Sequence, residues 1–114
     1  MDVNNVYSEQ VAKQLGFNPT LVEHVYLIPD GKNLALEVFQ GGHEYSTKQI
    51  RIELWVRTTS GGDTLINCGY GQDFHKRVEQ DFEGDGDRKI VVKMINGDPG
   101  QLHMTASWFG RLSG

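Results

Sequence analysis

The sequence predicts an α+β domain. We expect an antiparallel sheet of five or six strands, open or closed into a small sandwich or roll, with an N-terminal helix and a second short helix near residues 73–82. Three observations predict this class. Apolar and polar residues alternate over residues 50–57, apolar residues recur at helical spacing in two other segments, and turn-forming residues separate the segments at short intervals.

The length and composition indicate one globular domain over residues 1–114. The chain has 114 residues, of which 38% are hydrophobic, and no apolar run approaches the ~20 residues of a membrane span. A net charge of −4 disfavours binding to a phosphate backbone, so we expect neither a membrane nor a nucleic-acid partner. The one cysteine, Cys68, and an N-terminus without a signal-peptide pattern predict a cytoplasmic protein.

Residues 7–15 have the pattern of a short helix. Ser8 is a suitable N-cap, and Val11 and Leu15 lie four residues apart. Gly16 can end the helix in the left-handed conformation. These signals predict the N-terminal helix.

Residues 21–28 allow either a second helix or a strand. Their β-branched and aromatic side chains favour the strand. Asp30-Gly31 then supplies a typical tight turn before the apolar run of residues 34–39. We therefore expect these two segments to form a hairpin.

The clearest strand covers residues 50–57, because its apolar positions alternate with Arg51, Glu53, Trp55 and Arg57. A further strand over residues 64–68 follows a glycine-rich turn. Strands over residues 89–95 and 102–109 are joined by turn formers, and short connections should pair neighbouring strands antiparallel. The predicted core is Ile50, Ile52, Leu54, Val56, Ile90, Val92, Met94, Met104 and Trp108.

The second helix is predicted over residues 73–82. Phe74, Val78 and Phe82 recur there at intervals of four, which is the spacing of one helix face. Such a helix would pack its apolar side against the sheet.

Residues 8–25 carry a resemblance to a known motif. Ala12 would let two helices cross closely, and Gly16 would form the turn. The core positions are apolar: Leu15, Val22 and Val25. In these residues the segment resembles the helix-turn-helix of bacterial regulators, which implies DNA binding. Its recognition helix would lack Arg and Lys, so this is a lesser alternative.

Five carboxylates lie within nine residues, and their mutual repulsion would be relieved by a partner with a basic surface. They are Glu79, Asp81, Glu83, Asp85 and Asp87. The last four also suggest a divalent cation, but an EF-hand register places Val92 where a bidentate glutamate is required. We expect a docking segment, with the cation as the weaker alternative and no other cofactor.

Trp55 lies on the face of its strand that is predicted to be exposed to solvent. An exposed tryptophan is typical of a partner anchor, or of a sugar-stacking site that Tyr70 would share. If a helix covers this side of the sheet, Trp55 belongs to the core instead.

No catalytic or cofactor motif keeps the required spacing. We predict a small acidic non-catalytic interaction protein, such as an inhibitor, an immunity-like protein or an accessory factor. Its predicted partner-binding residues are Glu79, Asp81, Glu83, Asp85, Asp87, Trp55, Arg51 and Arg57. A ligand- or carbohydrate-binding β module is the first alternative, a DNA-binding regulator the second, and an enzyme the last. A homo-oligomer is compatible with the same features.

Overall fold

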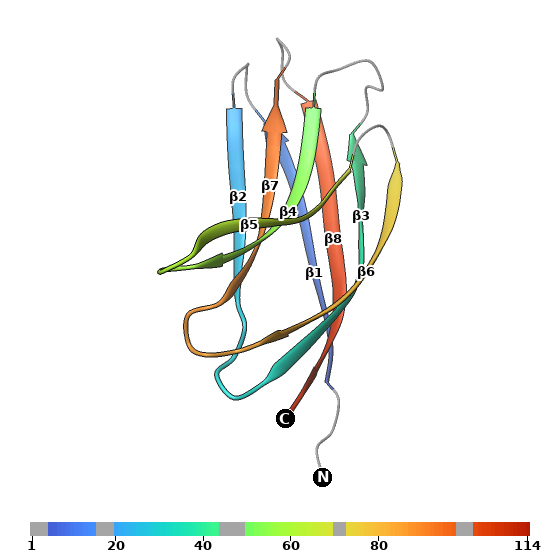
Figure 1. The fold of residues 1–114 in the computed structure, drawn as a ribbon. Coiled ribbons are helices and arrows are strands. Elements are labelled where there is room, and N and C mark those ends of the chain that lie inside the picture. The colour runs from blue at the N-terminus through green and yellow to red at the C-terminus, as the bar shows by residue number, and fades with distance from the viewer. Residues whose placement is uncertain (1–4, 16–19, 44–49, 70–72, 98–101) are drawn as a thin grey trace.

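The computed structural model describes residues 5–15, 20–43, 50–69, 73–97 and 102–114. These residues form eight β-strands and no helix (Figure 1). The strands are β1 (Asn5–Leu15), β2 (Thr20–Leu27), β3 (Asn33–His43), β4 (Ile50–Thr58), β5 (Gly62–Gly69), β6 (Phe74–Glu83), β7 (Lys89–Asn96) and β8 (Leu102–Ser113). The same residues contain no helix long and apolar enough to cross a bilayer.

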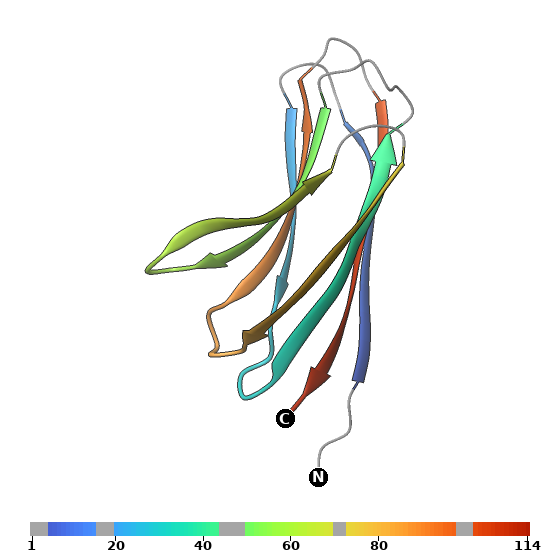
Figure 2. The same ribbon diagram turned by 45° about the vertical axis from the view of Figure 1, so that its right-hand side comes forward.

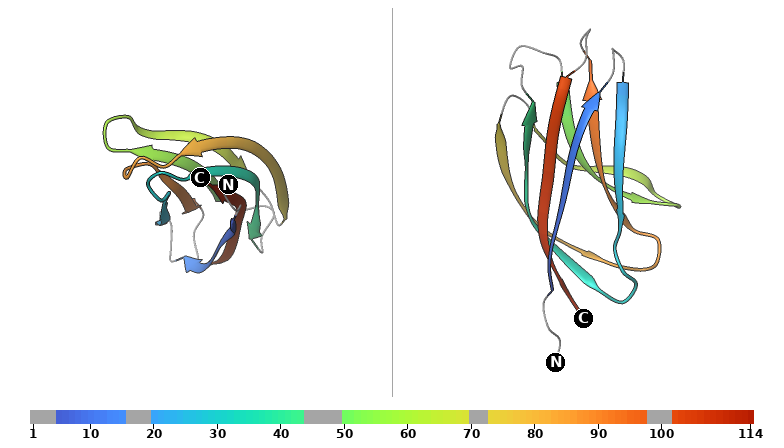
Figure 3. Two further views of the ribbon diagram at one scale, coloured as in Figure 1. Left: turned by 90° about the horizontal axis from the view of Figure 1, so that it is seen from below. Right: turned by 180° about the vertical axis from the view of Figure 1, so that it is seen from behind.

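Two four-stranded antiparallel sheets pack face to face. Sheet A has the strand order β1-β8-β3-β6, and sheet B has the order β2-β7-β4-β5. Every connection except the one between β4 and β5 therefore passes from one sheet to the other. Eight strands in this order form a jelly roll. Seen from behind, β1 and β8 lie side by side in front of sheet B (Figure 3).

The core fills the space between the sheets, because each strand turns alternate residues inward. Trp108 of sheet A and Tyr26 of sheet B meet edge to face, with ring centroids 5.2 Å apart. The sequence-predicted core is confirmed where side chains are described: Ile52, Leu54, Ile90, Val92, Met94, Met104 and Trp108 are at most 1% exposed, and Val56 packs against them. The side chain of Ile50 lies outside the described residues.

Both predicted helices are wrong, and the fold class is all-β instead of α+β. Residues 7–15 belong to β1, which pairs with β8 without a break from Asn5 to Leu15. Pairing over the whole strand outweighs helix signals that amount to a few tenths of a kcal/mol per residue. Residues 74–82 belong to β6. Residues four apart share one face of a strand as well as of a helix, so the spacing of Phe74, Val78 and Phe82 could not distinguish a helix from a strand.

The helix-turn-helix interpretation and the first hairpin are wrong for a related reason. Residues 8–15 and 20–25 lie in β1 and β2, which belong to different sheets, and Gly16 lies outside the described residues. The turn at Asp30-Gly31 is confirmed, with Gly31 at a φ of 79°. It connects two sheets, however, because β2 pairs with β7 while β3 pairs with β6 and β8.

Bulges shape one side of the sandwich. In β6, Val78 and Glu79 together face Glu37 of β3, and Glu79 takes a φ of 54°. The register of β5 against β4 shifts beside Trp55. Bulges increase twist and bend a strand. The β4–β5 hairpin accordingly curves away from the body of the sandwich (Figure 2).

Candidate functional site

The outer face of sheet B differs from that of sheet A in polarity. Its outward residues are Leu21, Glu23, Val25, Leu27, Arg51, Glu53, Trp55, Arg57, Asp63, Leu65, Lys89, Val91, Lys93 and Ile95. Among residues 21–43, 51–69, 73–97 and 103–114, whose burial is described, it holds every large hydrophobic side chain that is exposed: Leu21 (55%), Val25 (44%), Leu27 (48%) and Leu65 (47%). Sheet A instead presents a polar depression of about 250 Å³, lined by residues such as Gln40, Thr105 and Ser107.

An apolar row crosses the whole outer face of sheet B. The register places Val25 beside Val91, Val91 beside Trp55, and Trp55 beside Leu65. Val91 is fully buried although it belongs to the outer side, away from the core cluster. Side chains from the neighbouring strands must therefore cover it.

An ionic network spans this face. The Arg57 guanidinium donates two hydrogen bonds to Asp63, at 2.6 and 2.9 Å, and two to Glu23, at 3.1 and 2.9 Å. Lys93 Nζ lies 2.8 Å from Asp63 and 3.9 Å from Glu23. Two cations and two anions from all four strands thus meet over the sheet, and their charges cancel.

The network shifts the pKa values of its members. Hydrogen bonds from Arg57, and then from Lys93, hold the pKa of Asp63 well below its ordinary value of 3.8. The hydrogen bonds from Arg57 also lower the pKa of Glu23 from 4.5. The hydrogen bonds that Arg57 donates to Asp63 and Glu23 raise the pKa of Arg57 itself. The ionised network is therefore the stable form at neutral pH.

These shifts predict a slope of stability with pH. Between the ordinary values of 4.5 and 3.8 and the depressed values, the unfolded chain binds more protons than the native chain, so the free energy of unfolding falls as the solution is acidified. We expect Asp63→Asn and Arg57→Met to flatten this slope below about pH 4.5 in urea titrations. Equal slopes in the wild type and both variants would contradict the network's role.

Trp55 is half-buried on this face, and no helix in the described ranges covers it. Its indole Nε1 donates a hydrogen bond of 2.9 Å to Glu53, and Lys93 Nζ lies 4.3 Å from the ring centroid. Glu53 also pairs with Arg51 at 3.2 Å. Neighbouring polar groups therefore hold the ring in one orientation, which lowers the entropy lost when a partner packs on it.

The predicted acidic segment divides into two parts. Glu79, Asp81 and Glu83 are exposed on β6, and we call them the acidic stripe. Asp85 instead accepts backbone hydrogen bonds from Asp87 and Arg88, at 2.9 and 2.8 Å. These hydrogen bonds lower the pKa of Asp85, and the one from Arg88 has the larger effect. Asp85 thus stabilises the turn between β6 and β7.

Asp87 joins that turn to the β4–β5 hairpin. It accepts hydrogen bonds from the hydroxyl and the backbone N–H of Thr59, at 2.6 and 2.9 Å, and these lower its pKa. In the described residues no group of three or more His, Cys, Asp or Glu side chains could hold a metal ion. The four acids suggested for a cation thus do not converge on one site.

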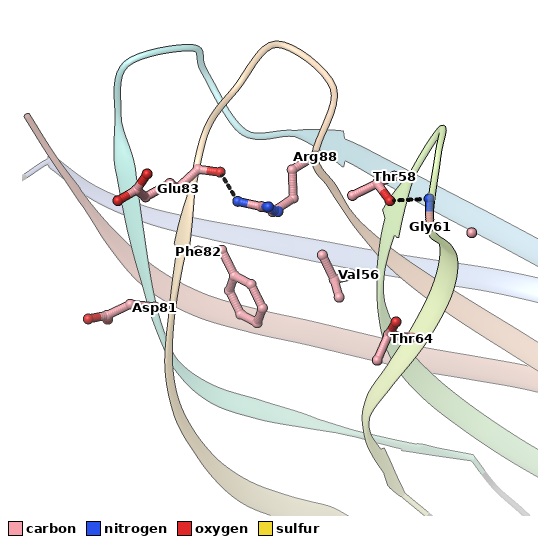
Figure 4. A pocket seen from close by; sticks show the side chains of 9 residues that line it. Val56, Thr58, Gly61, Thr64, Asp81, Phe82, Glu83 and Arg88 are labelled. Atoms are coloured by element: carbon pink, nitrogen blue, oxygen red, sulfur yellow. Dashed lines mark hydrogen bonds between the residues drawn. The ribbon is translucent and has the colours of Figure 1, made fainter.

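A pocket of about 490 Å³ lies between the β4–β5 hairpin and the β6–β7 turn (Figure 4). Phe82 and Val56 point into it from the two sheets, whereas the carboxylates of Asp81 and Glu83 point away. Arg88 Nη1 donates to the Glu83 carbonyl at 2.6 Å. The residues that line the pocket are Val56, Thr58, Gly61, Gly62, Thr64, Asp81, Phe82, Glu83 and Arg88.

The structure brings together Arg51, Trp55 and Arg57, as the alternation predicts, but places the acidic stripe on the other sheet. The sequence reasoning missed Glu23, Asp63 and Lys93. Only the alternation of residues 89–95 could have placed Lys93 outward, and nothing local indicates which strands are neighbours. Tyr70, proposed for a sugar site, lies outside the described residues.

No known protein family and no curated protein matches this sequence. The Drosophila NLP core, studied for pentamer formation and histone binding, shares 12% identity and a TM-score of 0.48 over 91% of this chain and 97% of that chain. Chains of infectious bursal disease virus share 9% identity and a TM-score of 0.54 (Gt strain) or 11% and 0.50 (Gx strain), over 96% and 97% of this chain. This chain spans 33% of each viral chain, and the likeness concerns the fold alone.

Proposed function

We propose that this domain is a non-catalytic protein-interaction module that binds its partner through the outer face of sheet B. The proposal depends on the segregation of exposed apolar side chains: Leu21, Val25, Leu27 and Leu65 share this one face. Trp55 lies in the row between Val25 and Leu65 and is held in place by Glu53 and Lys93. An ordered aromatic ring among apolar side chains is typical of a binding hot spot.

The partner we infer has a basic surface beside an apolar patch. The chain carries a net charge of −4, and the ionic network on the outer face of sheet B is internally neutral. Glu79 of the acidic stripe lies 3.7 Å from Arg77, so the unbalanced negative charge of the stripe is that of Asp81 and Glu83. Their strand, β6, neighbours β5 at the side of the sandwich. The acidic stripe would lie at the rim of the interface with the partner and would raise the rate at which the two proteins associate. The acidic composition and the single cysteine favour the cytoplasm for this interaction.

A capture experiment with matched aromatic variants tests this proposal. The chain is immobilised, proteins retained from the source lysate are identified, and a one-to-one binder is measured by surface plasmon resonance. We expect Trp55→Ala to weaken binding at least about tenfold, through faster dissociation. Phe109→Ala is the matched control, because Phe109 lies on the outer face of sheet A with Arg111 5.6 Å from its ring. It should bind like the wild type.

A second arm of the experiment concerns the acidic stripe. The triple variant Glu79→Gln, Asp81→Asn and Glu83→Gln should associate more slowly and with a flatter dependence on salt. Equal losses in Trp55→Ala and Phe109→Ala would rule out the outer face of sheet B as the binding surface. Unchanged rates in the triple variant would leave the stripe as ordinary solvated surface.

The pocket favours one alternative, a small ligand-binding module. Its volume of about 490 Å³ fits a small sugar, with the Phe82 ring as a wall and Thr64 as a hydroxyl donor. Its one cationic side chain, Arg88, is already bonded to the Glu83 carbonyl. A mono- or disaccharide seen by ligand-observed NMR to bind the wild type but not Thr64→Trp would favour this alternative over a protein partner.

A further inference from the structure

The free edges of the sandwich differ in how well they are protected against another strand. Unpaired N–H and C=O groups on an edge strand can bond to a further strand unless bulges, charges or Pro prevent it. The β6 edge has the bulge at Glu79 and the exposed cations Lys76 and Arg77. The β5 edge has its own register shift and curves away. These two edges are therefore poor templates, and β1, the other edge strand of sheet A, contains the cation Lys13.

The β2 edge lacks these protections. It pairs with β7 in one unbroken register from Thr20 to Leu27, and it contains no Pro, Gly, Lys or Arg. Its outward side chains include the exposed Leu21, Val25 and Leu27. A regular strand of eight residues with exposed apolar side chains is an open site for strand addition.

The one carboxylate of β2 does not shield this edge. Glu23 is bonded by both guanidinium Nη atoms of Arg57, which belongs to β4 on the far side of β7. Lys93 of β7 lies 3.9 Å from the same carboxylate. The Glu23 carboxylate is therefore neutralised by cations of β4 and β7. A strand that approaches β2 meets no net charge on the outer face.

We propose that β2 pairs with β2 of a second copy of this chain, antiparallel about a two-fold axis, so that sheet B continues through both copies. An antiparallel strand edge is self-complementary under such an axis. The neutral network removes the repulsion that two copies of an acidic chain would otherwise meet. The outer face around Trp55 stays open in this dimer, so the inference goes beyond the proposed function, and both use the exposed apolar side chains of β2.

Side-chain chemistry selects the register of the pair. Residues directly opposite in an antiparallel pair share one face, so outward residues must face outward residues. One register of largest overlap places Glu23 opposite Glu23 of the second copy and leaves the exposed Leu27 outside the paired segment. The other places Leu21 opposite Leu27 of the second copy and Glu23 opposite Val25 of the second copy. We infer the second register.

Light scattering on a size-exclusion column tests the dimer across protein concentrations. We expect the wild type to show twice the chain mass of 12.8 kDa. Leu21→Lys with Leu27→Lys sets lysine against lysine twice and should raise the dimer dissociation constant about 30-fold. Leu21→Glu with Leu27→Lys sets glutamate against lysine in the inferred register and should restore the dimer.

Leu65→Lys is the matched control, because Leu65 is 47% exposed on the other edge of sheet B, close to the 48% of Leu27. It should remain dimeric, and circular dichroism checks that each variant is folded. A wild type that is monomeric at every concentration, a dimer that survives both lysines, or failure of the glutamate–lysine pair to restore it would overturn the proposal. These outcomes leave the Trp55 and Phe109 comparison unaffected.

Discussion

Replacing Trp108 with alanine is expected to lower the free energy of unfolding by about 3–5 kcal/mol, as large-to-small changes of buried aromatics do. Trp108 is 1% exposed, and its ring meets Tyr26 of the opposite sheet with centroids 5.2 Å apart. The change removes the largest buried side chain and opens a cavity between sheets that the paired strands cannot close. A domain of ordinary stability would lose about a third or more of its free energy of unfolding.

Urea unfolding followed by circular dichroism measures this loss. Trp108→Phe keeps most of the volume and should cost clearly less than alanine. It also leaves Trp55 as the single tryptophan, so its fluorescence reports on the outer face of sheet B. Loss of less than about 1 kcal/mol in Trp108→Ala would contradict the placement of this ring between the sheets.

Gly84→Ala is expected to destabilise the domain by about 2–4 kcal/mol, because it forces apart two turns that close one end of the sandwich. Gly84 N donates to the Lys32 carbonyl at 2.7 Å, and Gly31 N donates to the Gly84 carbonyl at 3.1 Å. A Cβ at Gly84 would collide with the carbonyl group of Pro29 and would lie 3.0 Å from Cγ2 of Ile28. Backbone atoms cannot move aside as a flexible side chain does.

Gly86→Ala is the matched control in the same turn. Gly86 has a φ of 85°, and nothing lies within 4 Å of an added Cβ. Its substitution should cost about 1 kcal/mol, from the left-handed backbone alone. Thermal unfolding of the two variants compares steric collision with backbone strain. A smaller loss for Gly84→Ala than for Gly86→Ala would show that the two turns do not pack as described.

The local sequence was sufficient for the strands whose two faces differ. Alternation over residues 50–57 predicts both the buried Ile52 and Leu54 and the outward Trp55, because a strand side-chain period of two leaves no other arrangement. Asp30-Gly31 likewise predicts its turn, since few residue pairs adopt positive φ readily. It does not predict which strands the turn connects by hydrogen bonds.

The candidate surface could be predicted only in part. Arg51, Trp55 and Arg57 belong to one strand, so their common face follows from sequence. Glu23, Asp63 and Lys93 come from three further strands. Their meeting with Arg57 depends on sheet order and register, which leave no trace in any short segment.

The sequence by itself determined which segments alternate, where the chain turns, and which described side chains of β4 and β7 face the core. Only the tertiary structure decided that residues 5–15 and 74–83 are strands, because each gains its hydrogen bonds from a partner distant in the chain. It also decided that successive strands, except β4 and β5, lie in different sheets. The physical reason is that helix and turn signals act over a few residues, whereas strand pairing and sheet packing join residues throughout the chain and outweigh them.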